Sequence, residues 1–276
     1  MRTKKLLTCL LIIFTIFLTA CGNVEYDVEN STLKVHFIDV GQADCILIQA
    51  PTGENMLIDA GNNADADTII SYIDDQRVRK IDVLVGTHPH EDHIGSLDTV
   101  IDTYDIGKIY MPKVTNSTKT FEDVLAAIQN KGLKITTAVG GTNISFSPDT
   151  KVELLAPNSS EYDELNNYSA VIKLTYREIS FLFTGDAEDI SENEMMAKGY
   201  DLKADILKVG HHGSNSSTTE EFLEAVGPTY AVISVGKGND YGHPHKEVLT
   251  RLSEAGIKIY RTDESGTVVF STDGAN

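Results

Sequence analysis

Apolar residues along this chain follow two patterns: short runs rich in Val and Ile, and longer segments in which apolar positions recur every three or four residues. The runs are typical of buried strands, and the longer segments are typical of helices that pack on one face. They predict strands at about Leu33–Ile38, Cys45–Ile48, Asn55–Asp59, Ile81–Val85, Lys108–Met111, Lys151–Leu155, Ala170–Tyr176, Ile179–Thr184, Ile206–Val209, Tyr230–Val235, Lys258–Arg261 and Thr267–Phe270. They predict helices at about Asp65–Asp74, Ser96–Thr103, Phe121–Asn130, Ile190–Lys198, Glu220–Ala225 and Lys246–Ala255. Strands that alternate with amphipathic helices indicate an α/β fold.

The first 21 residues do not fit this pattern. A basic start precedes the apolar stretch Leu6–Ala20, which is too short for a comfortable bilayer span and is typical of an export signal. The stretch ends in Leu-Thr-Ala-Cys-Gly, which resembles the lipobox of bacterial lipoproteins, cleaved before a cysteine that then carries lipid. We therefore expect residues 1–21 to be a lipoprotein signal peptide, with an uncleaved signal anchor as the alternative. The domain is then expected at the extracellular face of the cytoplasmic membrane, lipid-anchored through Cys21 after cleavage.

Residues 22–32 are polar and acidic and predict a short tether. Residues 33–276 contain no linker-like or low-complexity segment and are expected to form one domain, within the size range of large single α/β folds. Cleavage would remove Cys9, and a lipidated Cys21 cannot form a disulfide, so a disulfide framework is excluded even in an exported protein. The apolar neighbours of Cys45 predict that it is a small core residue.

The chain is acidic, with a formal net charge of −18, and removal of the signal peptide would take further positive charge away. Broad electrostatic capture of nucleic acid needs a basic face, so this composition argues against that mode of binding. It does not exclude a phosphodiester substrate that is held by metal ions.

The segment Thr87–Gly95, with the sequence THPHEDHIG, concentrates side chains that bind zinc-like metals through imidazole nitrogen or carboxylate oxygen. Within six positions it contains His88, His90, Asp92 and His93. Pro89 cannot donate to a sheet, so the strand predicted before it should stop there. The ligands are therefore expected in a loop at the strand end, with a helix that opens at about Ile94–Gly95.

Residues two apart in an extended chain point the same way, so His88 and His90 can hold one metal. Asp92 and His93 lie just beyond and are placed for a second metal. The pattern HxHxDH after a hydrophobic strand resembles the metallo-β-lactamase superfamily, and this resemblance implies a four-layer αββα sandwich. Many members place a further ligand histidine in the following interval, but here no histidine occurs between His93 and His211. That departure leaves one ligand of the first metal open.

The segment Asp39–Asp44, DVGQAD, resembles the DVGQGD signature that opens the metallohydrolase domain of the DNA-uptake protein ComEC, with alanine in place of one glycine. Polar groups between two apolar strands need partners, so we expect Gln42 to be bonded and Asp44 to support the site or face it. Asp59, at the next strand end, is expected to accept hydrogen bonds from the histidine loop. His36, among apolar neighbours, is expected to be a sheet residue rather than a ligand.

Two further motifs follow predicted strands. The resemblance implies that Asp186, in a Thr-Gly-Asp sequence, bridges both metals with its two oxygens. The sequence His211-His212-Gly-Ser resembles the HHGS motif of ComEC-like proteins. One of these histidines should bind the second metal, while the other fills the open position of the first metal or touches substrate. We favour His211 for the second metal, and His212 stays the alternative.

The last motif runs from Asn239 to His245 and resembles the N-x-YGHP segment of the same family. A strand is predicted to end shortly before it, and Pro244 is suited to open a helix. His243 is therefore expected at a strand-end rim, close to the positive N-terminus of that helix. There it can donate a proton or a hydrogen bond to the leaving oxygen, while Asp92 orients the attacking hydroxide.

These motifs imply a metal-dependent hydrolase with two divalent ions, zinc or manganese, that bridge a water through Asp186 and lower its pKa toward about 7. We expect a phosphodiesterase or nuclease, because the ComEC-like branch is linked to the degradation of DNA strands. The expected substrate is DNA or a cell-envelope polymer. A hydrolase of carbon electrophiles, β-lactams or thioesters, is the competing enzyme, and a surface-binding lipoprotein with a degenerate site is the competing non-enzyme.

Overall fold

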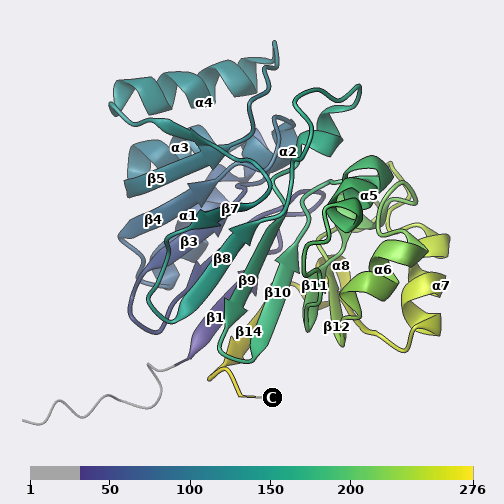
Figure 1. Ribbon diagram of the computed structural model, residues 1–276. Helices are drawn as coiled ribbons and strands as arrows, with labels where there is room; N and C mark the ends of the chain where they lie inside the picture. The colour runs from purple at the N-terminus through teal and green to yellow at the C-terminus, as the bar shows by residue number, and fades with distance from the viewer. Residues whose placement is uncertain (1–31, 276) are drawn as a thin grey trace, which may run out of the picture.

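The computed structural model describes residues 32–275, in which two β-sheets stack face to face and helices cover their outer faces (Figure 1). The expected signal peptide, Cys21 and nearly all of the expected tether lie outside the described residues. Within residues 32–275, no helix is both long enough and apolar enough to cross a membrane.

The first sheet has the strand order β14-β1-β2-β3-β4-β5-β6. Its antiparallel strands are β1 (Leu33–Phe37), β2 (Ile46–Gln49), β3 (Asn55–Ile58) and β14 (Val268–Thr272). The strands β4 (Lys80–Val85), β5 (Asp105–Met111) and β6 (Ile135–Thr137) continue the sheet in parallel with β3. The helices of this half are α1 (Ala66–Asp75), α3 (Leu97–Thr103) and α4 (Lys119–Asn130).

The second sheet repeats this arrangement, with the order β13-β12-β11-β10-β9-β8-β7. Its antiparallel strands are β7 (Thr142–Ile144), β8 (Thr150–Leu154), β9 (Ile172–Tyr176) and β10 (Ile179–Phe183). The strands β11 (Ile206–Lys208), β12 (Tyr230–Ile233) and β13 (Lys258–Arg261) run parallel to β10. The helices here are α5 (Asp189–Ala197), α6 (Glu220–Val226), α7 (Lys246–Glu254) and the short α8 (Thr262–Ser265).

Successive side chains along a strand point to opposite faces of the sheet and pack in different hydrophobic cores. Phe181 and Phe183 of β10 pack between the sheets, whereas Leu182 packs outward with residues of α5, α6 and α7. The first sheet likewise sends Leu57 and Leu84 outward to a third core with α1, α3 and α4. Because a strand has a period of two, one apolar run can face two cores. The predicted four-layer αββα sandwich is therefore confirmed.

The short elements were harder to predict. β6 and β7 have few buried residues and no alternation, and the pattern of apolar positions misses both. It also misses five short turns, which are η2 (Asn63–Asp65), α2 (Glu91–Ile94), η3 (Leu165–Tyr168), η4 (Gly210–Gly213) and α8. Three of these turns, α2, η3 and η4, carry residues of the site described next.

Candidate metal centre

The motifs singled out in the sequence gather at one edge of the sandwich, where the carboxyl ends of β3, β4, β10, β11 and β12 meet. The two sheets touch there, because the backbone N–H of Ala170 donates to the Thr87 carbonyl oxygen at 2.9 Å. The segments after these strands carry the predicted site residues, namely Asp59, His88, His90, Asp92, His93, Asp186, His211, His212 and His243.

The histidine loop begins directly after β4 and turns into α2. His90 is the N-cap of α2, so the helix opens at Glu91 rather than near Ile94, and His93 lies within it. The loop packs closely on the segment after β3. A Cβ on Gly95 would lie 2.2 Å from the backbone carbonyl carbon of Asn62, so a side chain at this position would force the two segments apart.

Asp59 supports this loop, as the sequence predicts. Its Oδ1 accepts from the backbone N–H of Thr87 at 2.7 Å, and its Oδ2 accepts from the Thr87 hydroxyl at 2.7 Å. Oδ2 also lies 2.8 Å from Nδ1 of His93. A carboxylate that accepts from Nδ1 leaves Nε2 of the same ring free for another partner. The support role expected of Asp59 is therefore confirmed by its contacts.

His88 and His90 face one another. Nε2 of His88 is 3.0 Å from Nδ1 of His90, a separation that suits two ligands of one metal. Burial, aided by the nearby charge of His93, holds the pKa of His88 well below its usual value, so this ring is neutral and its lone pair is available. Within residues 32–275, no Asp, Glu, Cys or further His side chain joins this pair in a group of three whose ligand atoms all lie within 4.8 Å of one another.

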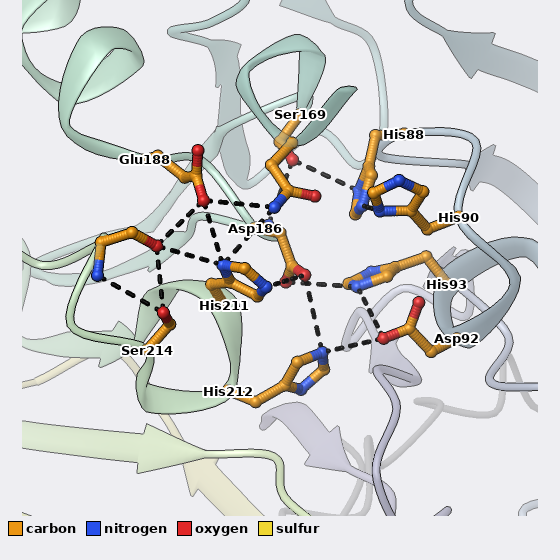
Figure 2. A network of polar contacts seen from close by, with 12 residues as sticks. His88, His90, Asp92, His93, Ser169, Asp186, Glu188, His211, His212 and Ser214 are labelled. Atoms are coloured by element: carbon orange, nitrogen blue, oxygen red, sulfur yellow. Dashed lines mark hydrogen bonds and ion pairs between the residues drawn. The ribbon is translucent and has the colours of Figure 1, made fainter. Parts of the chain in front are cut away.

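Asp92, His93, Asp186 and His212 do form a compact group, with ligand atoms all within 4.8 Å of one another. Nε2 of His93 is 3.2 Å from Oδ1 of Asp186, and Nε2 of His212 is 3.3 Å from Oδ2 of Asp92 (Figure 2). Both Nε2 atoms and Oδ1 of Asp186 are buried yet make no hydrogen bond. Buried polar atoms that converge without hydrogen bonds suit a cation between them. The side chains present therefore fit a divalent ion with two imidazole and two carboxylate ligands.

The compact group contains His212 and not His211, the histidine that the sequence analysis favoured for the second metal. His211 and His212 both adopt the left-handed backbone conformation, with φ of 49° and 53°. Residues other than glycine seldom adopt this conformation, and those that do are often found at functional sites. Nδ1 of His212 lies 2.9 Å from the Ser234 carbonyl oxygen, which can only accept. Nδ1 therefore carries the proton, and Nε2 is left as the ligand atom facing Asp186 and Asp92.

His211 lies on the other side of Asp186, in a polar network that the sequence does not reveal. Its Nε2 is 3.7 Å from Oδ2 of Asp186, and its Nδ1 is 3.3 Å from Oε1 of Glu188. The same Glu188 oxygen accepts from the Ser216 hydroxyl at 2.9 Å and from the Asn166 amide at 3.3 Å. Glu188 thus orients His211 toward Asp186, as Figure 2 shows. The only sequence signal for Glu188 is its position two residues after Asp186.

The carboxylates and imidazoles of the compact group hold one another in charged forms. Burial alone would lower the pKa of His93, but the carboxylates of Asp186 and Asp92 outweigh it and raise that pKa well above its usual value. The pKa of His212 is raised against burial by the same two groups. In return, the pKa values of Asp186 and Asp92 are lowered despite their burial. A bound cation would replace these imidazole protons, so metal binding should release protons.

A pocket of about 340 Å³ opens onto this centre. Its lining consists of Gln42, His90, Glu91, Asp92, Asn166, Asp186, His211, His212, Tyr241 and His243. A larger groove of about 780 Å³ runs between α6 and α7 but contains none of the predicted site residues. We place the site in the smaller pocket, because that is where the unbonded ligand atoms point.

His243 lies on the rim of the pocket, as predicted. Its ring stacks on Tyr241, with centroids 5.7 Å apart, and stands 5.5 Å from the ring of His211. Burial, together with the charges of His211 and His212, lowers the pKa of His243 to about 4. The expected closeness to a helix N-terminus belongs instead to His245, which is the N-cap of α7 and whose Nδ1 accepts from the backbone N–H of Asn215 at 3.0 Å.

An αββα sandwich with this cluster at the strand ends defines a class of metal-dependent hydrolases. Residues 38–237 match the profile of the Metallo-beta-lactamase superfamily, and the chain belongs to that superfamily. Its sequence is 31% identical to ComE operon protein 3 of Bacillus subtilis (strain 168), over 95% of this chain and 35% of that protein. It is also 31% identical to Competence protein ComA of Neisseria gonorrhoeae, over 92% of this chain and 35% of that protein. The chain thus spans about a third of the length of these curated relatives.

Solved structures show the same fold at low sequence identity. Igni18, a metallo hydrolase from Ignicoccus hospitalis, superimposes with a TM-score of 0.57 and 18% identity, over 87% of this chain and 98% of Igni18. Fold, ligand cluster and superfamily membership together identify a metal-dependent hydrolase.

Proposed function

We propose that this hydrolase cleaves phosphodiester bonds, with DNA or a cell-envelope polymer as its substrate. The observation that carries the proposal is the compact ligand group of Asp92, His93, Asp186 and His212, three of which line the pocket. His88 and His90, which face one another in the same loop as His93, form a second possible pair of ligands. These residues would hold two divalent ions, zinc or manganese, which when bound supply Lewis acidity toward a phosphoryl oxygen and an activated water.

The remaining side chains of the pocket have assignable roles. Asp92 is partly exposed where it lines the pocket, so it can orient an attacking water as well as face His212. His243 at the rim is neutral at pH 7, given its lowered pKa of about 4, and offers an imidazole N–H to the leaving oxygen. Of the two roles expected from the sequence, the lowered pKa favours the hydrogen bond over proton donation, because a neutral imidazole is a hydrogen-bond donor first and a weak acid second.

The acidic surface agrees with a substrate recruited by metal rather than by a basic face. The net charge of −18 would repel a polyanion at long range, and the pocket lining contains no lysine or arginine. Similarity to a protein named for competence, ComA, favours nucleic acid within this substrate class.

The deciding experiment is a substrate screen of metal-loaded protein on DNA, bis-aryl phosphodiesters and a chromogenic β-lactam, with Asp186→Asn as the inactive control. We expect phosphodiester turnover that Asp186→Asn abolishes. Robust β-lactam turnover without phosphodiester cleavage would favour the carbon-electrophile alternative. Fully metal-loaded protein that turns over none of these substrates would favour the surface-binding lipoprotein.

We also propose that the mature protein is held at the extracellular face of the cytoplasmic membrane through lipid on Cys21. The lipobox-like sequence before that residue is the basis of this proposal. Cys21→Ser should block processing and lipidation, which mass spectrometry of the membrane fraction would detect. Wild-type protein released without lipid into the medium would contradict it.

A further inference from the structure

A lysine side chain is fully buried beneath the metal centre. Lys208 is the last residue of β11 and has no exposed surface. Its register partners, Phe183 and Val232, both belong to the core between the sheets. Residues in register on neighbouring strands face the same side, so the Lys208 side chain also projects between the sheets. Lysine is almost never fully buried unless it is paired.

The partner of this lysine is Asp44 of the DVGQAD segment. Nζ of Lys208 lies 2.8 Å from Oδ2 of Asp44 and donates to the Val209 carbonyl oxygen at 2.9 Å. Asp44 is itself only 1% exposed. The ion pair therefore joins a motif of the first sheet to the strand that leads into the HHGS motif of the second. Neither residue lines the pocket.

Asp44 stands directly behind two of the imidazoles in the ligand group. Its Oδ1 is 3.6 Å from Nδ1 of His212, and its Oδ2 is 4.0 Å from Nδ1 of His93. Both rings turn their other nitrogen toward Asp186. The backbone N–H of Asp44 also donates to the Asp92 carbonyl oxygen at 3.0 Å. The Asp44–Lys208 pair is therefore separated from the ligand atoms by one imidazole ring.

A charge at that distance alters how strongly a cation binds, because screening in a buried site is weak. Asp92 and Asp186 already supply two carboxylates, and Asp59 places a third behind His93. Asp44 alone would add a fourth negative charge at the same place. The ammonium group of Lys208, 2.8 Å from Oδ2 of Asp44, offsets that charge.

We propose that Lys208 is a positioning residue that sets the metal affinity of the centre by neutralising Asp44. The ion pair holds the affinity for the divalent ion below what four carboxylates would give. A bound ion then keeps enough positive charge to attract an anionic phosphoryl group. This inference rests on the metal-dependent function proposed above and deepens it.

The test is the Zn²⁺ dissociation constant, measured by chelator competition for Lys208→Met, Asp44→Asn and the double variant. Lys208→Met leaves an unopposed carboxylate and should tighten Zn²⁺ binding by about tenfold or more, whereas Asp44→Asn leaves an unopposed ammonium and should weaken it by about as much. The double variant should return to within about threefold of the wild type. A pair with a purely structural role would weaken binding in all three variants, and that result, or no change in any of them, would overturn the proposal.

Two controls keep the test decisive. Lys173 of β9 is another buried lysine, and its Nζ lies 2.8 Å from Oδ2 of Asp201. Lys173→Met should lower the free energy of unfolding without changing Zn²⁺ affinity. If Lys208→Met does not fold, Asp44→Asn and the double variant still decide, since the double variant must bind Zn²⁺ more tightly than Asp44→Asn. Failure of the hydrolase proposal would appear separately, as fully loaded wild-type protein that binds Zn²⁺ normally but cleaves no phosphodiester.

Discussion

The side-chain carbonyl oxygen of Gln42 accepts a hydrogen bond from the backbone N–H of Gly236 at 3.0 Å, although the two residues are 194 positions apart. The two backbones also approach closely, because a Cβ on Gly236 would lie only 2.7 Å from the backbone nitrogen of Gln42. It fixes the loop that leads from β12 to His243 against the first sheet. Through this contact the DVGQAD segment helps to shape the pocket, which Gln42 also lines.

Replacing Gln42 should therefore impair turnover through the rim. Gln42→Ala leaves the Gly236 N–H without its acceptor, at a cost of about 1–3 kcal/mol in the free energy of unfolding. We expect lower turnover with unchanged metal content, measured by phosphodiester assay and elemental analysis. Gln42→Glu keeps an acceptor oxygen and is the matched control. Loss of metal in Gln42→Ala would mean that this contact supports the ligands rather than the rim.

Alanine variants of the two adjacent histidines, His211 and His212, should differ in metal content. Because His212 belongs to the compact ligand group and His211 does not, His212→Ala should lose about one ion per chain. His211→Ala should keep its metal and lose turnover, because its Nε2 faces Asp186 from the pocket side. Elemental analysis of the purified variants decides between them. The reverse pattern would restore His211 as the ligand.

The pair His88 and His90 should hold a separate ion. The double variant His88→Ala/His90→Ala removes both imidazoles and should lose about one ion per chain while the compact group keeps its own. Titration of metal-free protein should then show one binding event instead of two. Unchanged metal content in the double variant would remove the pair from the metal centre.

His243 should matter for chemistry and not for metal. We expect His243→Ala to lose on the order of a hundredfold in turnover, the usual scale for one group that acts on the leaving oxygen. Its metal content should be unchanged, because His243 does not belong to the compact ligand group and its ring lies beside the imidazoles of His211 and His212. His245→Asn preserves a helix N-cap and is the neighbouring control. Metal loss in His243→Ala would make it a ligand.

A pH dependence of stability should come from His36 of β1, which belongs to neither group of candidate metal ligands within residues 32–275. Its Nδ1 lies 2.9 Å from the Tyr72 hydroxyl, and burial together with the charge of Lys34 lowers its pKa to about 4. Between pH 6.5 and 4 the unfolded chain binds a proton here that the folded chain does not. Folding stability should therefore fall as the pH falls through this window, by about 2 kcal/mol at pH 5.

Urea unfolding at pH 7.5 and pH 5 would measure this contribution. In His36→Phe the ring packing is kept and the proton site is removed, so the loss of stability on acidification should be smaller than in the wild type by that amount. Equal losses in both proteins would show that His36 does not contribute to the pH dependence.

Sequence predicts best what is local. His88, His90, Asp92 and His93 stand within six positions after a run of apolar residues, so strand, loop and ligands follow from one short segment. The position of Asp186 at the edge of the sheet can be predicted equally well, because it follows a predicted strand closely. The fold class follows from the alternation of strands and helices, although the number of layers came from the family resemblance.

What sequence does not reveal depends on the backbone or on distant contacts. The choice between His211 and His212 turns on two consecutive left-handed residues, which no residue pattern announces. Glu188 has no signal beyond its place after Asp186. Lys208 ends a strand whose three residues are all buried, although lysine is rarely found in a core. The partner that compensates its charge, Asp44, is 164 positions away in the sequence, so the sequence pattern does not reveal it.

The first and last strands of the sandwich lie side by side, with Leu33 of β1 opposite Thr272 of β14 (Figure 1). β1 runs in the same direction as β3, whose carboxyl end carries Asp59, so Leu33 and Thr272 lie at the end of the sheet opposite the metal edge. The polypeptide thus enters and leaves the sandwich at one place, which is the arrangement that lets a domain be joined to or inserted in a longer protein. A segment joined at Leu33 or Thr272 would therefore start at the end of the sandwich away from the pocket.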